Sequence, residues 1–216
     1  DGDSIELVWR NDVGGLTFRL GDSRFVKWNP RTTGIDLDRE HVRLDWLMGR
    51  HPAPRIISFG DDGGAQWLLT TAVPGDCAVS DEWRARRSDA IRAIADGLRA
   101  IHAIPADGFP SEWVDEVWVG ATPESLGPRP PVDDPVVVHG DACAPNTLIS
   151  PQGAWTGNVD FGDLAVGDRW ADLAVASLSL DWNFGEGHQN ELFEAYGIEP
   201  DEERIRYYRQ LWELES

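Results

Sequence analysis

The sequence has few cysteines, no long apolar run and far fewer cationic than anionic side chains. Its two cysteines, Cys77 and Cys143, are too few and too far apart for a disulfide framework, which favours a reducing compartment. No apolar run approaches the length of a membrane span, and the acidic start, DGDSIELVWR, lacks the basic and apolar regions of a secretion signal. We therefore expect a soluble, cytoplasmic protein.

The shortage of basic residues bears on possible partners. There are 19 Lys and Arg against 38 Asp and Glu, a formal net charge of −19. Such a surface repels phosphate backbones, which argues against nucleic-acid binding. It could attract a cationic small molecule, or it could simply keep the protein soluble. The length of 216 residues fits one large domain or two small lobes.

The order of the predicted elements is β-rich first and α-rich afterwards. Alternating or periodic apolar residues predict strands and a helix in the first third, at residues 16–20, 24–28, 37–48 (the helix) and 65–73. From residue 80 onward helices dominate, around short strands at 136–138 and 157–160, whereas residues 105–135 are rich in Pro and Gly and irregular. We expect an α+β fold, with one part over residues 1–73, a hinge at about 70–75, and a larger helical part over residues 76–216.

Two turns that follow short apolar strands carry the polar groups needed for phosphoryl transfer. The stretch VVVHGDACAPNTLIS places Asp141 and Asn146 after one strand, and Asp160 opens the D-F-G turn after the next. One carboxylate can position or deprotonate an acceptor hydroxyl, while a carboxylate and a carboxamide hold Mg²⁺ on nucleotide phosphates. The spacing suits the two strands of one hairpin, so we expect both carboxylates to face one cleft.

A lysine far upstream could supply the cation for the phosphates. Lys27 lies on a predicted strand beyond the glycines at residues 14 and 15, and Glu40 on the following helix could fix it by an ion pair. H-x-D-x4-N followed by D-F-G, with a strand lysine and a helix glutamate upstream, resembles the protein-kinase signature set. Each motif alone is weak, but four in this order indicate a phosphotransferase.

The details resemble the aminoglycoside phosphotransferase family, and within it the kanamycin and streptomycin types. HGDACAPNTLI has Gly where protein kinases carry Arg, VDFGDLAVGDRWADLA is similar to the family pattern, and no long segment ending in A-P-E follows Asp160. The resemblance runs from Gly14 to YYRQLWEL. It implies a kinase-like bilobal fold, ATP or GTP with Mg²⁺, and transfer of the γ-phosphate to a hydroxyl of a cationic aminoglycoside, an antibiotic-resistance activity.

The same resemblance implies roles for individual residues. Asp141 would be the catalytic carboxylate, which also contacts the acceptor, and Asn146 and Asp160 would be Mg²⁺ ligands. Lys27 would contact nucleotide phosphates, and Glu40 would orient Lys27.

Further residues are expected to bind the nucleotide base and the acceptor. The strand end at residues 70–73, with Thr71 and Val73, would offer backbone bonds to adenine. Amine-binding groups of the acceptor site are expected in the loop after the helix that contains Asp172 and in the terminal LWELES, namely at Asp181, Trp182, Asn183 and Glu213. The alternative is that these are solvated surface residues. We term the turn that contains Asp141 and Asn146 the catalytic loop. His139 and Asp172 are expected to hold it.

Several features leave other interpretations open. Asp163 stands where many relatives have Arg, Ala144 where some have an acid, and residues 105–135 are fewer than the family usually has, so residues could be missing between about 113 and 135. The acceptor could instead be a macrolide, another antibiotic or an amino alcohol, or the chain could be an inactive kinase-like binding module. A hydrolase with Cys143 as nucleophile lacks a legible oxyanion site, and Asp168 could be only a helix N-cap. The oligomeric state stays open.

Overall fold

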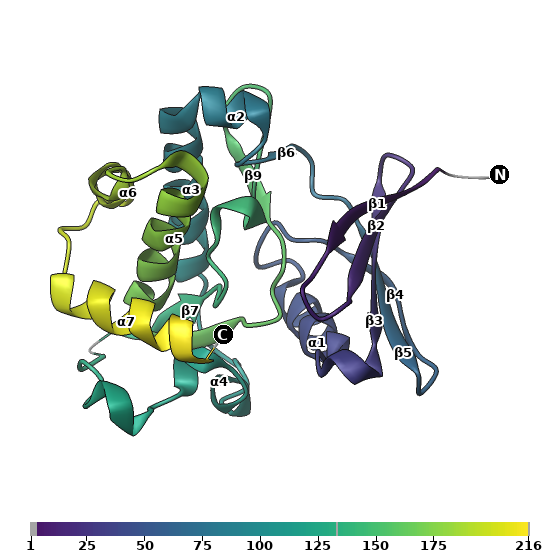
Figure 1. Cartoon of the computed structure of the whole chain (residues 1–216), viewed down its shortest axis with the longest axis horizontal. Coiled ribbons are helices and arrows are strands. Elements are labelled where there is room, and N and C mark those ends of the chain that lie inside the picture. The colour runs from purple at the N-terminus through teal and green to yellow at the C-terminus, as the bar shows by residue number, and fades with distance from the viewer. Residues whose placement is uncertain (1–3, 133, 216) are drawn as a thin grey trace. The chain divides into compact units, whose positions relative to one another are not determined.

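The structure is a computed structural model that describes residues 4–132 and 134–215. The chain divides into two compact units, Asp1–Val73 and Pro74–Ser216, and each is described by itself (Figure 1). Within the described ranges, every helix is too short or too polar to cross a membrane.

The first unit is built on an antiparallel sheet of five strands in the order β1-β2-β3-β5-β4. The strands are β1 (Ile5–Arg10), β2 (Leu16–Leu20), β3 (Arg24–Pro30), β4 (Ile56–Asp61) and β5 (Ala65–Thr71). A 3-10 turn, η1 (Arg31–Thr33), leads from β3 into the helix α1 (Leu37–Leu47), which packs against β4 and β5. The sheet and helix follow one another in Figure 1 from purple to blue.

The sequence patterns predicted the inner strands of this sheet and missed its two edges. The predictions at residues 16–20, 24–28 and 65–73 correspond to β2, β3 and β5. In contrast, β1 is exposed along its whole length, and β4 alternates poorly and contains a bulge. Edge strands without one buried face lack the period-two pattern on which strand prediction depends.

The second unit is mostly helical. Its longer helices are α3 (Arg87–His102), α5 (Arg169–Phe184), α6 (Gln189–Tyr196) and α7 (Glu202–Glu215), with the short α2 (Asp81–Ala85) and α4 (Glu112–Asp115). The helix α5 packs against α3, α6 and α7 (Figure 1). Its residues from Trp170 to Ser177 are all buried, so it lies at the centre of this unit, as a helix that is apolar on all sides must.

Two small sheets complete the second unit. One pairs β10 (Ala165–Gly167) with β7 (Val136–Val138), and the other has the order β6 (Asp76–Cys77), β8 (Thr147–Ile149), β9 (Trp155–Asn158). The stretch 105–135 contains α4 and the 3-10 turns η2 (Trp118–Gly120) and η3 (Glu124–Leu126). Although it is mostly irregular, as predicted, it buries Trp118 and Val119 in the core.

Candidate active site

The β8–β9 hairpin brings two of the predicted turn residues together. Thr147 pairs with Asn158 at its open end, and the N–H of Val159 donates to the Asn146 carbonyl at 3.0 Å. Asn146 ends the 3-10 turn η4 (Ala144–Asn146) just before β8, and Asp160 follows β9. The hairpin predicted to hold Asp141 and Asp160 is present between them, but Asp141 lies before η4 and not on a strand of it, so that part of the prediction was wrong.

Asp141 is held close to both residues. The Asn146 Nδ2 donates to the Asp141 carbonyl at 3.0 Å and to its Oδ2 at 2.9 Å. The other carboxylate oxygen, Oδ1, is buried and has no hydrogen-bond partner among the described residues. Burial, and secondly the charge of Asp160, raise the pKa of Asp141. A carboxylate held with one buried and unsatisfied oxygen is typical of a functional site.

The D-F-G turn has an unusual backbone. Asp160 adopts a left-handed conformation with φ of 69°, the one described non-glycine residue with positive φ. Such a conformation is disfavoured for a residue with a side chain and is found where the surroundings impose it. The surroundings here are a fully buried Phe161, whose ring lies 4.6 Å from that of His139. The turn therefore sets the direction of the Asp160 carboxylate.

Asp172 on α5 braces the catalytic loop. Its carboxylate accepts the backbone N–H groups of His139 at 2.7 Å and Gly140 at 3.0 Å, and it pairs with His102 Nε2 at 3.0 Å. His102 in turn contacts the Tyr196 hydroxyl at 2.7 Å. Burial acts to raise the pKa of Asp172, but its bonds to His102 and the loop outweigh burial and lower it.

His139 also has a structural role. Its Nδ1 accepts the N–H of Asp141 at 3.2 Å, so the ring proton belongs on Nε2, which faces the Val159 carbonyl at 3.0 Å. Both ring nitrogens are thus engaged in holding the two turns. Gly140 has φ of +81°, and a Cβ there would lie 1.9 Å from the Asp163 carbonyl oxygen. This close approach explains why glycine occupies the position between the histidine and the aspartate.

The donor atoms suit a magnesium ion. Since Asn146 commits its Nδ2 to Asp141, its carboxamide oxygen points away and can ligate a cation together with Asp160. Over the described residues there is no group of three or more His, Cys, Asp or Glu that could hold a metal. Mg²⁺ usually takes one or two carboxylates and completes its shell with phosphate oxygens and water, so this sparse set of oxygen donors fits Mg²⁺ better than zinc.

In the first unit, the ion pair expected from the sequence is present. The Lys27 Nζ on β3 lies 2.8 and 2.7 Å from the two carboxylate oxygens of Glu40 on α1, and Glu40 is 5% exposed. Lys27 is also the single lysine of the 216 residues. Buried glutamates are rare unless paired, so the pair fixes the direction of the lysine.

The loop between β1 and β2 is closed by a side chain. The Asn11 Oδ1 accepts the N–H of Gly15 at 2.6 Å, and the Asn11 N–H donates to the Gly15 carbonyl at 3.0 Å. Gly14 has φ of +102°, which favours glycine.

The strand end after β5, which is predicted to bind the nucleotide base, is bonded internally. The N–H groups of Thr71 and Ala72 donate to the carbonyl groups of Arg55 and Ser23. A base bound there would therefore take its N–H bond from Val73 rather than from Thr71.

The residues predicted for the acceptor site lie elsewhere than expected. Asp181, Trp182 and Asn183 are in the last turn of α5, not in the loop after it, because α5 continues to Phe184. The Asn183 Nδ2 donates to the Ser179 carbonyl at 2.8 Å. Trp182 is 59% exposed and can be reached by a ligand.

Asp181 has its own cation. Its Oδ2 lies 4.0 Å from Arg209 Nη2 on α7 and accepts from Gln189 at 3.3 Å, while its Oδ1 is buried and unbonded within the described part of the chain. Glu213 is exposed on α7. Burial lowers the pKa of Arg209, against the opposing charges of Asp181, Glu202 and Glu213. Arg209 thus partly neutralises Asp181.

Sequence reasoning missed three supporting residues of the loop. Trp118 Nε1 donates to the Gly140 carbonyl at 2.6 Å, and the Ser179 hydroxyl accepts the N–H of Ala144 at 2.9 Å; the third is His102. Each lies far from the motif in sequence, so no local pattern indicates it.

Two alternative roles left open by the sequence can now be judged. Burial, and secondly the charge of Asp141, raise the pKa of the Cys143 thiol, which opposes formation of the thiolate that a cysteine hydrolase needs. Asp168 is the N-cap of α5, accepting from Trp170 N at 3.1 Å.

The fold and the two turns define a kinase-like phosphotransferase, and comparison with known proteins agrees. A sequence model described as the phosphotransferase enzyme family matches residues 9–126 and 124–208. The chain is 34% identical to an aminoglycoside 3'-phosphotransferase of Streptomyces fradiae over 86% of this chain and 82% of that protein. It is 31% identical to the streptomycin 3''-kinase of Streptomyces griseus over 94% of this chain and 89% of that protein.

Solved structures give the same result. An aminoglycoside-3'-phosphotransferase of type VIII is similar with a TM-score of 0.79 and 28% identity, covering 99% of this chain and 94% of that one. The complex of a Streptomyces rimosus aminoglycoside phosphotransferase with ADP and streptomycin has a TM-score of 0.74 and 26% identity, over 99% and 93% of the two chains. The chain therefore belongs to the aminoglycoside phosphotransferase family.

The comparisons also bear on the short stretch before β7. The two matched segments meet at residues 124–126, inside the region where residues could be missing. The alignment with a relative from Escherichia coli extends over 261 residues although this chain has 216, so that relative has positions without a counterpart here. The family match ends at residue 208, which leaves Glu213 outside it.

Proposed function

We propose that this chain transfers the γ-phosphate of ATP or GTP to a hydroxyl of an aminoglycoside, and thereby confers resistance. The observation that carries the proposal is the catalytic loop, in which Asp141 keeps an unsatisfied carboxylate oxygen beside Asn146 and Asp160. A carboxylate with its pKa raised beside a second carboxylate suits a group that takes part in the transfer.

Each residue has a part in the transfer. Asp141 accepts a hydrogen bond from the acceptor hydroxyl and orients the oxygen of that hydroxyl toward the phosphorus. Because the transition state for phosphoryl transfer is loose, positioning by Asp141 matters more than early removal of the proton. Asn146 and Asp160 would hold Mg²⁺, which neutralises charge on the phosphates when bound. Lys27, oriented by Glu40, would contact the same phosphates.

The acceptor and the nucleotide are the finer parts of the proposal. The relatives whose names state a substrate act on aminoglycosides, and one similar structure contains ADP and streptomycin. The choice between ATP and GTP stays open. The cytoplasmic location, the roles of Thr71 and Val73 and the absence of nucleic-acid and membrane partners stay predictions. The net charge of −19 supports a cationic acceptor through long-range attraction.

A coupled assay of nucleotide hydrolysis and transfer tests the proposal. The protein is incubated with Mg-ATP or Mg-GTP and a kanamycin-type, streptomycin-type or macrolide acceptor, and phosphorylated product is identified by mass spectrometry. We expect aminoglycoside phosphate with at least one nucleotide, and no product from Asp160→Ala. Transfer to a macrolide alone would contradict the aminoglycoside assignment and leave the kinase chemistry standing. An absence of transfer to every acceptor would contradict the activity itself.

A further inference from the structure

Two buried carboxamides lie beside Lys27 in the first unit. Asn29 on β3 and Gln66 on β5 are direct partners in the strand register, and they are 3% and 1% exposed. Side chains of paired residues share one face of a sheet, as do residues two apart in a strand. We term Asn29 and Gln66 the carboxamide rung. It lies on the same face of the sheet as Lys27, two residues further along β3.

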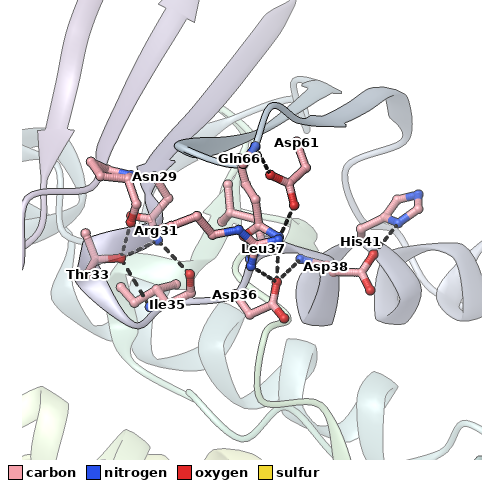
Figure 2. A network of polar contacts seen from close by, with 12 residues as sticks. Asn29, Arg31, Thr33, Ile35, Asp36, Leu37, Asp38, His41, Asp61 and Gln66 are labelled. Atoms are coloured by element: carbon pink, nitrogen blue, oxygen red, sulfur yellow. Dashed lines mark hydrogen bonds and ion pairs between the residues drawn. The ribbon is translucent and has the colours of Figure 1, made fainter.

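The carboxamide rung clamps the segment that joins β3 to α1. The Asn29 Nδ2 donates to the Thr33 hydroxyl at 2.8 Å and the Ile35 carbonyl at 3.0 Å. Gln66 continues the clamp at the helix start, as Figure 2 shows: its Oε1 accepts the N–H of Leu37 at 2.9 Å, and its Nε2 donates to Asp36 Oδ1 at 2.6 Å.

These bonds set the beginning of α1. Asp36 is the N-cap, and its Oδ1 also accepts the N–H of Asp38 at 3.1 Å. Leu37 is the first helical residue, whose N–H would otherwise lack a partner in the helix. Gln66 thus satisfies one terminal N–H directly and fixes the capping side chain as well. Because a helix is stiff, the position of its first turn determines where Glu40, one turn further on, meets Lys27.

The rung reaches the β1–β2 loop too. A Cβ on Gly15 would lie 2.2 Å from the Asn29 Oδ1, so the loop backbone rests directly on this carboxamide. One face of Asn29 therefore touches the glycine loop and its amide nitrogen holds the entry to α1. Buried polar groups that are fully hydrogen-bonded specify one arrangement.

We infer that Gln66 and Asn29 are positioning residues that set the register of α1 on the sheet and thereby keep Lys27 and Glu40 paired for the nucleotide phosphates. The consequence for the nucleotide rests on the proposed function, whereas the geometry of the pair does not. Both act through the segment between β3 and α1.

The test measures the environment of Lys27 directly. Because the sequence has one lysine, reductive methylation with ¹³C-formaldehyde labels that side chain and the terminal amine, and NMR separates the two signals. A half-buried, ion-paired amine reacts slowly. Leucine is similar in size to glutamine, so Gln66→Leu removes the hydrogen bonds to Leu37 and Asp36 with little change in volume. We expect the methylation rate of Lys27 to rise roughly five- to tenfold, on the scale of two lost hydrogen bonds.

Two further variants separate positioning from general destabilisation. Leu47→Ala opens a cavity at the other end of α1 without touching the rung, so it should lower the melting temperature and leave the Lys27 rate within about twofold of wild type. The variant Gln66→Glu keeps an acceptor for the Leu37 N–H but replaces the donor to Asp36 by a like charge, so it should also raise the Lys27 methylation rate. It serves in place of Gln66→Leu if that variant does not fold.

Steady-state kinetics connect the rung to the nucleotide. For Gln66→Leu we expect the nucleotide KM to rise about tenfold and the acceptor KM to stay unchanged. An unchanged Lys27 rate in folded Gln66→Leu or Gln66→Glu, or an equal rise in Leu47→Ala, would overturn the inference. The labelling does not depend on catalytic turnover. If the protein transfers phosphate to no acceptor, the proposed function is refuted, but the labelling result still decides the role of Gln66.

Discussion

The catalytic loop and the end of α5 both contain carboxylates that the sequence predicts to be site residues, but the neighbours of these carboxylates differ. Asp141 accepts from Asn146, and burial and the charge of Asp160 raise its pKa against the lowering effects of His139, Cys143 and Asn146. Asp181, in contrast, faces Arg209, with Gln189 bonded to the same oxygen. In the catalytic loop the charge of a second carboxylate raises the pKa of Asp141, whereas at the end of α5 an arginine lies within ion-pair distance of Asp181.

This difference indicates which region is built for a cation. A carboxylate whose pKa is raised partly by a second carboxylate gains from a bound Mg²⁺, because the ion offsets the repulsion between the two charges. A carboxylate already paired with arginine gains much less from an incoming ammonium group. An acidic residue in the expected place is therefore weak support for an acceptor site until its neighbours are known.

The largest effect is expected where the charge is least balanced. Asp141→Asn should lower kcat by at least about 10²-fold, the usual scale for a positioned acid–base group, with the nucleotide KM nearly unchanged. Asp163→Asn, a substitution of a carboxylate just beyond the D-F-G turn, serves as the matched control and should keep most of the activity. Near-normal turnover by Asp141→Asn, measured with saturating Mg-nucleotide, would remove Asp141 from the mechanism.

The support beneath the loop predicts a pH-dependent loss of stability. Asp172→Asn places an amide among donors that need an acceptor, so it should destabilise the protein by about 2–3 kcal/mol at pH 7. The folded state lowers the pKa of Asp172, so its stabilisation is fully present above the unfolded pKa near 3.9 and is lost as pH falls through the lower folded value. Urea unfolding at pH 7 and pH 3 should show the difference between wild type and variant narrowing. A constant difference would contradict this assignment.

Local motifs allowed most of the catalytic loop to be predicted. The turn residues Asp141, Asn146 and Asp160 follow short apolar strands, and the helical spacing around Glu40 placed it one helix after Lys27. These features are close in sequence or depend on one element each. The prediction of a hairpin for Asp141 was wrong because η4 intervenes, and a 3-10 turn of three residues leaves no periodic signal.

Long-range partners could not be predicted. Trp118 reaches the Gly140 carbonyl across 22 residues, and His102 reaches Asp172 across 70, and nothing in either local sequence marks these bonds. The end of α5 was misplaced for a different reason. Its last turn, with Asp181 and Asn183, has the composition of a polar loop, but α5 continues to Phe184 and ends at Gly185, which has a positive φ.

The acceptor residues should give smaller effects. Glu213 is exposed, so Glu213→Ala should raise the KM for a polyamine sugar by about two- to fivefold, as exposed charge pairs contribute up to about 1 kcal/mol. The nucleotide KM should not change, and the effect should shrink at high salt. Glu203→Ala, at the start of the same helix, is the matched control. Equal effects of the two substitutions would mean that Glu213 acts only through net charge.

The smallest and most informative effect concerns Arg209. If Asp181 binds an acceptor ammonium, Arg209 competes with it, and Arg209→Gln should lower the acceptor KM by about twofold while leaving kcat and the nucleotide KM unchanged. Arg209 also donates to Ser177 and Gln189 at 2.8 Å each, so thermal unfolding must confirm that the variant is folded. The double variant Arg209→Gln with Asp181→Asn should then lose the gain, because no carboxylate remains for the amine. If instead the acceptor KM rises in Arg209→Gln and stays equally high in the double variant, the arginine supports the acceptor site through its contacts between α5, α6 and α7, and Asp181 is not an amine ligand.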